Sequence, residues 1–199
     1  MSAENMTIKT RAAYQAAVTK AQELGHADIT PEHFMAALFA EADGLPVQVL
    51  RRLGLEPAKV TALFTNYLER LPRAPGNFEP GQNLSGDARK FLQLAEKEMN
   101  GLGDQYLSLE HLLLAYANGN FALKKDLEAL GLERRKLAQI FEGLDEQIQI
   151  QPFDPLQVHE GNTSLSRAQE NLRRDVATSR GKVIGTYLQS QLADLKSGR

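Results

Sequence analysis

Two short stretches decide the fold of this 199-residue chain. Residues 29–34 read Ile-Thr-Pro-Glu-His-Phe, and residues 107–112 read Leu-Ser-Leu-Glu-His-Leu, 78 positions later. The match extends upstream at the same offset, where Gly25 corresponds to Gly103, and downstream at an offset of 77. An ordered series of matches over about 60 residues indicates an internal repeat, in which each copy is one supersecondary unit.

Each copy is expected to form four helices, because its apolar residues recur at steps of three and four. Gly25 is placed to end the first helix, since glycine accepts the left-handed conformation. Thr30 and Ser108 suit the N-cap of the second helix of each copy, and Pro31 suits the first helical position. No run alternates with period two for long enough to indicate a strand. The predicted fold is all-α: a pseudo-twofold tandem repeat of two four-helix units, eight helices in all.

The predicted double-repeat domain spans residues 7–148, with repeat one at 7–71 and repeat two at 85–148. The loop predicted between them, residues 72–84, contains three prolines and two glycines, which exclude a helix there.

A second proline-containing break predicts a linker over residues 149–163. Beyond it, residues 164–196 carry an apolar stripe that predicts an amphipathic helical tail outside the repeat. Two interpretations of this tail remain open: it folds back on the double repeat, or it pairs with another chain.

Composition excludes several classes of function. A formal charge of −2 and dispersed basic pairs do not favour nucleic-acid binding. The absence of cysteine excludes disulfides, thiolate zinc sites and cysteine nucleophiles. No run approaches the ~20 apolar residues that span a bilayer, and the N-terminus lacks a signal-peptide pattern. We therefore expect a cytoplasmic protein with no membrane partner.

Catalytic motifs are also missing from the sequence. It contains no G-x-x-x-x-G-K-[ST] phosphate loop and no G-x-S-x-G nucleophile elbow. His33 and His111 each follow a glutamate, but neither has a second ligand at i+3 or i+4, so we predict no metal site. The chain is expected to be no enzyme and to need no cofactor.

The repeated strings, ITPEHF at 29–34 and GDQYLSLEHLLLA at 103–115, resemble the Clp N-terminal (Clp R) repeat domain. The resemblance covers roughly residues 7 to 148 and is closest to the N-domain of ClpB-type AAA+ chaperones. It implies a non-catalytic module that captures unfolded or arginine-bearing protein segments, or adaptors, for a Clp chaperone or protease system.

The resemblance also implies a set of peptide-binding residues. The apolar groove and acidic rim of ClpB-type domains correspond to Leu92, Asp104 and Glu110, and the paired arginine-recognising glutamates of ClpC-type domains fall on Glu32 and Glu110. Two positions depart from the family pattern: Arg11 stands where a threonine is usual, and Glu98 replaces a groove leucine. These departures imply a smaller or reshaped groove.

The residues also allow a purely structural interpretation of the same positions. Leu92 could belong to the core, Asp104 could stabilise the turn at Gly103, and Glu32 and Glu110 could complement helix dipoles.

Three functional hypotheses follow. In the first, the chain binds protein clients or adaptors by itself, with Clp ATPase or protease subunits as further partners. In the second, it is an assembly or accessory factor that docks on a Clp protease or chaperone ring, with the apolar stripe of the tail as the docking element. The tail is also a candidate for self-association. In the third, it is the N-terminal part of a larger ClpB-like disaggregase.

Overall fold

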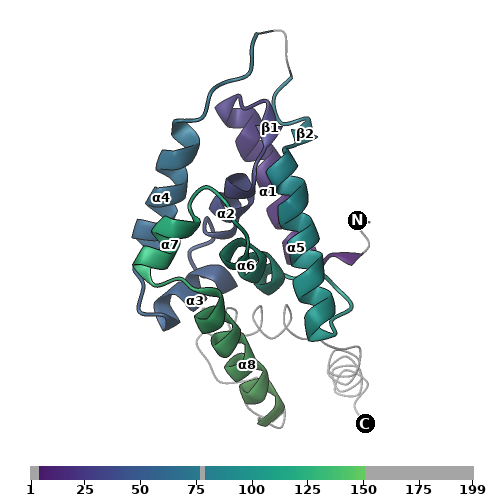
Figure 1. Ribbon diagram of the computed structural model, residues 1–199, viewed down its shortest axis with the longest axis vertical. Coiled ribbons are helices and arrows are strands. Elements are labelled where there is room, and N and C mark those ends of the chain that lie inside the picture. Colours follow the sequence, from purple (N-terminus) through teal and green to yellow (C-terminus); the bar gives the residue numbers. More distant parts are fainter. Residues whose placement is uncertain (1–4, 77–78, 151–199) are drawn as a thin grey trace, which may run out of the picture.

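The computed structural model describes residues 5–76 and 79–150, and these residues form eight α-helices and two short strands. Repeat one consists of α1 (Ile8–Leu24), α2 (Pro31–Leu38), α3 (Leu45–Arg52) and α4 (Pro57–Glu69). Repeat two consists of α5 (Gly86–Leu102), α6 (Leu109–Asn118), α7 (Lys124–Leu130) and α8 (Arg134–Ile150). The predicted all-α fold with two four-helix units is confirmed (Figure 1).

The two long helices that open the repeats begin and end in the same way. Both α1 and α5 have 17 residues, and the hydroxyls of the N-caps Thr7 and Ser85 accept backbone N–H groups in the first turn. Both helices end at a glycine with positive φ, 72° at Gly25 and 77° at Gly103. A left-handed residue at this position satisfies the last carbonyl groups of the helix, and only glycine adopts it without steric penalty.

The two short strands were not predicted from the sequence. Each strand has two residues, β1 (Asp28–Ile29) and β2 (Asn83–Leu84), and they pair in parallel. Two residues are too few to produce an alternating pattern, so the strands are visible only in the tertiary structure.

These strands belong to a pairing that the pseudo-twofold axis repeats. The Ser85 N–H donates to the Ile29 carbonyl at 2.9 Å, and the Thr7 N–H donates to the Leu107 carbonyl at 3.0 Å. The second pair is the first pair with the two repeats exchanged, because Thr7 is equivalent to Ser85 and Leu107 is equivalent to Ile29. The segment before the first helix of each repeat is therefore tied to the segment after the first helix of the other repeat.

The core lies where the two repeats meet. In Figure 1, α2 and α6 occupy the middle of the molecule, with α1 and α5 on one side and α4 and α7 on the other. Aromatic rings join the repeats there: Phe34 packs on Phe91 with ring centroids 5.5 Å apart, and Phe64 packs on Tyr116 at 5.6 Å. Such pairs stabilise beyond their burial of apolar area, so one continuous core holds both units together.

Helix α8 continues to Ile150, two residues past the predicted domain boundary. The remainder of the linker predicted for 149–163 and the tail predicted for 164–196 lie outside the described residues. Within residues 5–76 and 79–150, no helix combines the length and the apolar character that crossing a bilayer would require.

Candidate functional site

Two of the three predicted acidic residues, Glu32 and Glu110, lie in the first turns of α2 and α6. Thr30 and Ser108 are the N-caps of these helices. At the third helical position of each, a histidine closes a capping box: the N–H of the N-cap residue donates to its Nδ1, at 3.0 Å in α2 and 2.9 Å in α6. Because Nδ1 accepts in both rings, each histidine carries its proton on Nε2.

In repeat one, the Nε2–H of His33 donates to Nδ1 of His26 at 2.8 Å. Burial, followed by the nearby positive charge on Arg73, lowers the pKa of His26. Burial also lowers the pKa of His33 from 6.5 to about 4, and His26 and Lys20 act in the same direction. Both rings are therefore neutral at physiological pH, and they join the end of α1 to the start of α2.

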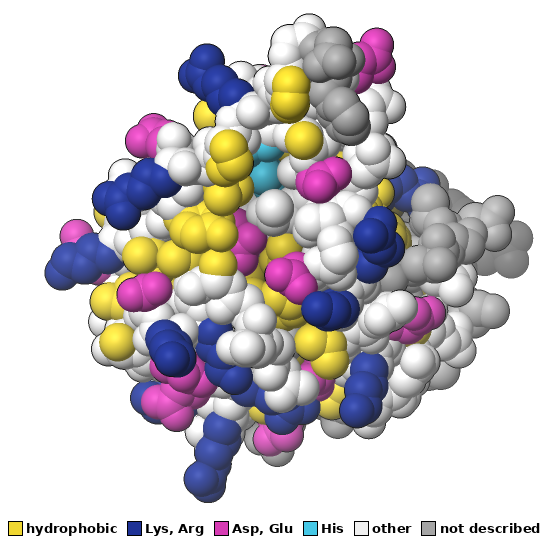
Figure 2. All heavy atoms as spheres, turned by 45° about the horizontal axis from the view of Figure 1, so that its top comes forward, with side chains coloured by type: hydrophobic (Ala, Val, Ile, Leu, Met, Phe, Trp, Pro, Cys, Tyr) yellow, Lys and Arg dark blue, Asp and Glu magenta, His cyan; other side chains and the backbone are white. Residues whose placement is uncertain are grey.

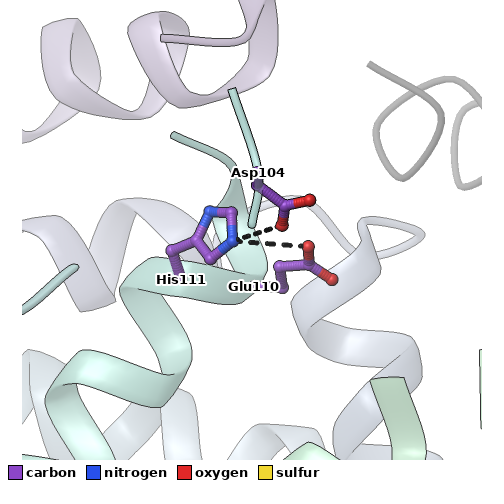
Figure 3. Close-up of side chains that lie close together, drawn as sticks. All are labelled: Asp104, Glu110 and His111. Carbon is purple, nitrogen blue, oxygen red and sulfur yellow. Dashed lines mark hydrogen bonds and ion pairs between the residues drawn. The ribbon is translucent and has the colours of Figure 1, made fainter. Parts of the chain in front are cut away.

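In repeat two, the equivalent histidine donates to a carboxylate instead of to a second imidazole ring. Nε2 of His111 donates to Oδ2 of Asp104 at 2.8 Å, and Oε1 of Glu110 lies 3.6 Å from the same nitrogen (Figure 3). Asp104 occupies the position in repeat two that His26 occupies in repeat one. The structure thus brings two of the predicted site residues, Asp104 and Glu110, to one point between the end of α5 and the start of α6.

Within the described part of the chain, Asp104, Glu110 and His111 form a cluster that could hold a metal ion. Their potential ligand atoms all lie within 4.8 Å of one another. A metal would have to take Nε2 of His111 as its ligand, yet that nitrogen carries the proton because Nδ1 accepts the Ser108 N–H. Coordination would therefore require the loss of the capping box. The chemistry of this donor set does not fit a divalent metal.

Glu32 is held across the repeat boundary by a tyrosine. The Tyr116 hydroxyl donates to Oε1 of Glu32 at 2.9 Å, and it accepts the Leu123 N–H at 3.3 Å. Burial and the adjacent Glu32 charge raise the pKa of Tyr116, so the phenol keeps its proton and remains a donor. In repeat one, the residue equivalent to Tyr116 is Leu38, so Glu110 has no matching tyrosine.

The acidic residues do not form the exposed rim that the sequence predicted. Glu32 is 3% exposed, Glu110 1% and Asp104 7%, and all three lie below the surface. Leu92, on α5, is 7% exposed and belongs to the hydrophobic core. It lies about 15 Å along the helix axis from Leu102, the last residue of α5 before the segment that carries Asp104. A ligand at the surface would therefore interact with the electrostatic field of these carboxylates without direct contact with their oxygen atoms.

The start of α1 carries an exposed apolar side chain. Because the Thr7 N–H bonds to the Leu107 carbonyl, the start of α1 lies against the segment between Asp104 and Glu110. Ile8, the first residue of α1, is 82% exposed, the highest value among the large hydrophobic residues described. The end of the molecule that carries β1 and β2 shows a related pattern, with acidic side chains and a histidine recessed among hydrophobic ones (Figure 2).

Sequence reasoning identified Glu98 as a departure from the family but missed its role. The guanidinium of Arg134 holds both oxygens of the buried Glu98 carboxylate, with Nε–Oε1 at 3.0 Å and Nη2–Oε2 at 2.6 Å. Asn118 donates to the same carboxylate at 3.0 Å. Glu98 therefore joins α5, α6 and α8, and it faces partners rather than an apolar groove. The 36-residue separation between Glu98 and Arg134 left no local pattern by which to find the pair.

A separate depression of about 480 Å³ lies between the α2–α3 turn, α3 and α4. Its surface is mainly apolar, with Phe39 and Val47 among its lining residues. None of the four predicted site residues lines it.

Comparison with known proteins places this geometry in a family. The family model for the Clp repeat (R) N-terminal domain matches residues 5–130, which include both helix starts and the acidic residues of the site. The chain belongs to the Clp repeat (R) N-terminal domain family. The resemblance noted in the sequence is thereby confirmed.

Relatives of this Clp N-domain chain include ClpB chaperones. The chain is 39% identical over 119 residues to ClpB of Corynebacterium diphtheriae, which covers 60% of the chain and 14% of that protein. It is 34% identical over 141 residues to ClpB of Mycobacterium tuberculosis, which covers 71% of the chain and 16% of that protein. The chain therefore spans about one seventh of the length of these curated relatives.

Solved structures with the same fold include other Clp N-domains. The N-terminal domain of the ClpV1 ATPase from E. coli EAEC has a TM-score of 0.59 at 21% identity and covers 69% of this chain and 83% of its own. The Hsp104 N-terminal domain from Candida albicans has a TM-score of 0.57 at 19% identity and covers 67% and 86%. A ClpV N-domain solved in complex with a VipB peptide has a TM-score of 0.53 at 19% identity and covers 68% and 88%.

Proposed function

We propose that this Clp N-domain chain captures polypeptide segments that combine apolar and cationic side chains, and that it performs no chemistry on them. The protein clients or adaptors it binds would be handed to a Clp chaperone or protease system. The observation that carries the proposal is that Asp104 and Glu110 converge on His111, while the start of α1, which carries the exposed Ile8, is bonded through Thr7 to Leu107, between the two acidic residues in the sequence.

The physical basis is a combination of two weak interactions. An exposed side chain such as Ile8 gains about 25 cal/mol for each Å² of apolar surface that a partner covers. Two carboxylates just beneath the surface favour a guanidinium or ammonium group, because water screens them less than it screens fully exposed charges. Together they favour extended segments in which apolar and basic residues alternate.

The relatives support binding of this kind. One ClpV N-domain of the same fold was solved with a VipB peptide, and another solved structure of this fold is described as a peptide from the SciI protein. Those partners belong to those proteins. For this chain, Glu32, Leu92, Asp104 and Glu110 remain the proposed peptide-binding residues.

Peptide titration tests this function. A labelled unstructured peptide carrying four arginines and two leucines should bind and raise the fluorescence anisotropy, and the same peptide with glutamates in place of the arginines should not. Glu110→Gln, which preserves the size of the side chain, should weaken binding about tenfold, equivalent to 1.4 kcal/mol. Asp43→Asn, in an exposed carboxylate on another part of the chain, serves as the matched control and should change nothing. Equal binding of both peptides would refute the proposal.

A second candidate function follows from the length of the ClpB relatives. We propose as the alternative that the same module receives substrates as the N-terminal part of a larger ClpB-like disaggregase, since the match covers only 14% of the length of the ClpB relative. The mass of the endogenous protein, measured on an immunoblot against this domain, distinguishes the two. A 22.0 kDa band favours the free module, and a much larger band favours the disaggregase.

A further inference from the structure

The depression between the α2–α3 turn, α3 and α4, here called the α3–α4 depression, has a buried apolar base and exposed sides. Phe39 and Val47 are buried and form part of its lining. Along α4 its lining consists of short side chains, among them the exposed Ala58 and Ala62. Among the described residues that line it, Arg51 carries the one charge. Such a surface suits apolar side chains from another segment, because burial of apolar area is favourable.

The equivalent positions of repeat two carry charged side chains that are bonded to neighbours. With the offset of 77 residues, the equivalents of Val47, Arg51 and Pro57 are Lys124, Glu128 and Arg134. Nζ of Lys124 lies 3.8 Å from Oε1 of Glu128, and Arg134 holds both oxygens of the Glu98 carboxylate. In repeat two these positions therefore bond within the repeat, whereas in repeat one they leave an apolar hollow.

Residues 164–179, in the predicted tail, have a sequence pattern that complements this hollow. Apolar residues recur there at steps of three and four, which predicts one apolar face on a helix: Leu165, Ala168, Leu172 and Val176. No glycine or proline interrupts residues 162–180. At 3.6 residues per turn, Asp175 borders the apolar face, and its charge is opposite to that of Arg51.

The chain between α8 and this segment is long enough to return to the depression. Helix α8 packs on α3 (Figure 1), and its 17 residues measure about 25 Å. Because contacting helices lie about 10 Å apart, the end of α8 lies no more than about 35 Å from α3. Residues 151–163 span up to about 45 Å when extended. So short a tether also keeps the tail at an effective concentration of about millimolar, which favours docking even on a weak site.

We propose that residues 164–179 form a helix that docks in the α3–α4 depression of the same chain, with its apolar face on Phe39 and Val47. The tail then covers in repeat one the surface that repeat two occupies with its own charged side chains. Docking of this kind is independent of the peptide binding proposed above, because none of the four proposed peptide-binding residues lines the depression.

Thiol reactivity in the full chain tests the docking, because the sequence contains no cysteine. Ala62→Cys places a thiol on the face of α4 that lines the depression. Gln139→Cys places one at the equivalent exposed position of α8 and is the matched control. Leu172→Asp, added to either variant, puts a charge on the apolar face of the tail and should release it from the depression.

The measurement is the rate of reaction with N-ethylmaleimide, followed by mass spectrometry. At position 62 the rate should be about tenfold lower without Leu172→Asp than with it, as for a tail that is docked about nine-tenths of the time. At position 139 the rate should be the same with and without Leu172→Asp. The protection at position 62 should also be independent of protein concentration, because the tail and the depression belong to one chain.

Three results would overturn the docking of the tail on its own chain. The first is a rate at position 62 that Leu172→Asp leaves unchanged. The second is an equal effect of Leu172→Asp at positions 62 and 139, which would mean that the tail does not select the depression. The third is protection that increases with protein concentration, which would assign the depression to the tail of a second copy.

Discussion

The starts of α2 and α6 have the same hydrogen-bond arrangement, and they differ in one acceptor. In both, an N-cap N–H donates to Nδ1 of a histidine, and the Nε2–H of that histidine donates to an acceptor seven residues earlier, 2.8 Å away. In repeat one the acceptor is the neutral ring of His26, and in repeat two it is the carboxylate of Asp104. Bonds to an ionised acceptor are roughly twice as strong as neutral ones.

This difference shows that the repeated backbone does not determine the charge of the side chains it carries. The same turn holds the neutral pair of His26 and His33 in repeat one and the acidic pair of Asp104 and Glu110 in repeat two. We expect the exchange of a single acceptor to alter the stability of the helix start and its charge. Each of these consequences can be measured by making the two repeats alike.

The largest effect is expected when the donor to the carboxylate is removed. His111→Ala leaves the buried Asp104 carboxylate without its histidine donor, and the loss of a partner from a buried charged group lowers the free energy of unfolding by more than the about 1 to 3 kcal/mol that a neutral group loses. His33→Ala removes a neutral bond and should cost about 1 to 3 kcal/mol. Both substitutions also remove a capping box, so urea denaturation of the two variants isolates the effect of the acceptor. Equal losses would contradict the comparison.

The next effect is the response of repeat one to acid. The pKa of His33 is about 4 in the folded chain against an ordinary value of 6.5, so between these pH values the unfolded chain binds a proton that the folded chain does not. The free energy of unfolding should therefore be highest above pH 6.5 and fall by about 3 kcal/mol as the pH is lowered to 4, at 1.36 kcal/mol per unit. The lowered pKa of His26 adds a loss of the same sign.

His33→Gln is the matched control for this pH dependence. Glutamine at the third helical position preserves a capping box but does not titrate. Urea midpoints measured from pH 7.5 to 4 should therefore change less steeply for His33→Gln than for the unmodified chain. Identical slopes would mean that the histidine pair does not govern acid stability.

The smallest of the three effects concerns the hydrogen bond from Tyr116 to Glu32. The residue equivalent to Tyr116 in repeat one is Leu38, so no tyrosine donates in this way to Glu110. Tyr116→Phe removes the donor to Glu32 and the acceptor for the Leu123 N–H, and loss of a partner from a buried polar group costs about 1 to 3 kcal/mol. Tyr14→Phe, which removes the hydroxyl of a half-buried tyrosine on α1, is the control and should cost less. Thermal unfolding followed by circular dichroism compares them. A Tyr116→Phe variant as stable as the control would show that Glu32 does not depend on this bond.

The local features of the site could be predicted from the sequence. Thr30 and Ser108 as N-caps, Pro31 at the first helical position and Glu32 and Glu110 in the first turns are all confirmed, because each depends on residues within one turn of helix. The spacing of seven residues between each acceptor and its histidine was also present in the sequence. Only the structure showed that it corresponds to a hydrogen bond.

The long-range contacts could not be predicted in this way. Tyr116 is 84 residues from Glu32, and Arg134 is 36 residues from Glu98. The burial of Glu32, Asp104 and Glu110 was not foreseen either, since a charged residue in the first turn of a helix is exposed in most proteins.

The sequence by itself determined that the chain is a duplicated four-helix unit, because helix periodicity, caps and left-handed glycines act over distances of a few residues. Only the tertiary structure showed that Asp104 and Glu110 lie close together beside His111. This arrangement depends on the packing of each repeat against the other, which buries the two helix starts. In the low dielectric of the interior, the electrostatic effect of an aspartate in place of a histidine is larger than it would be in water.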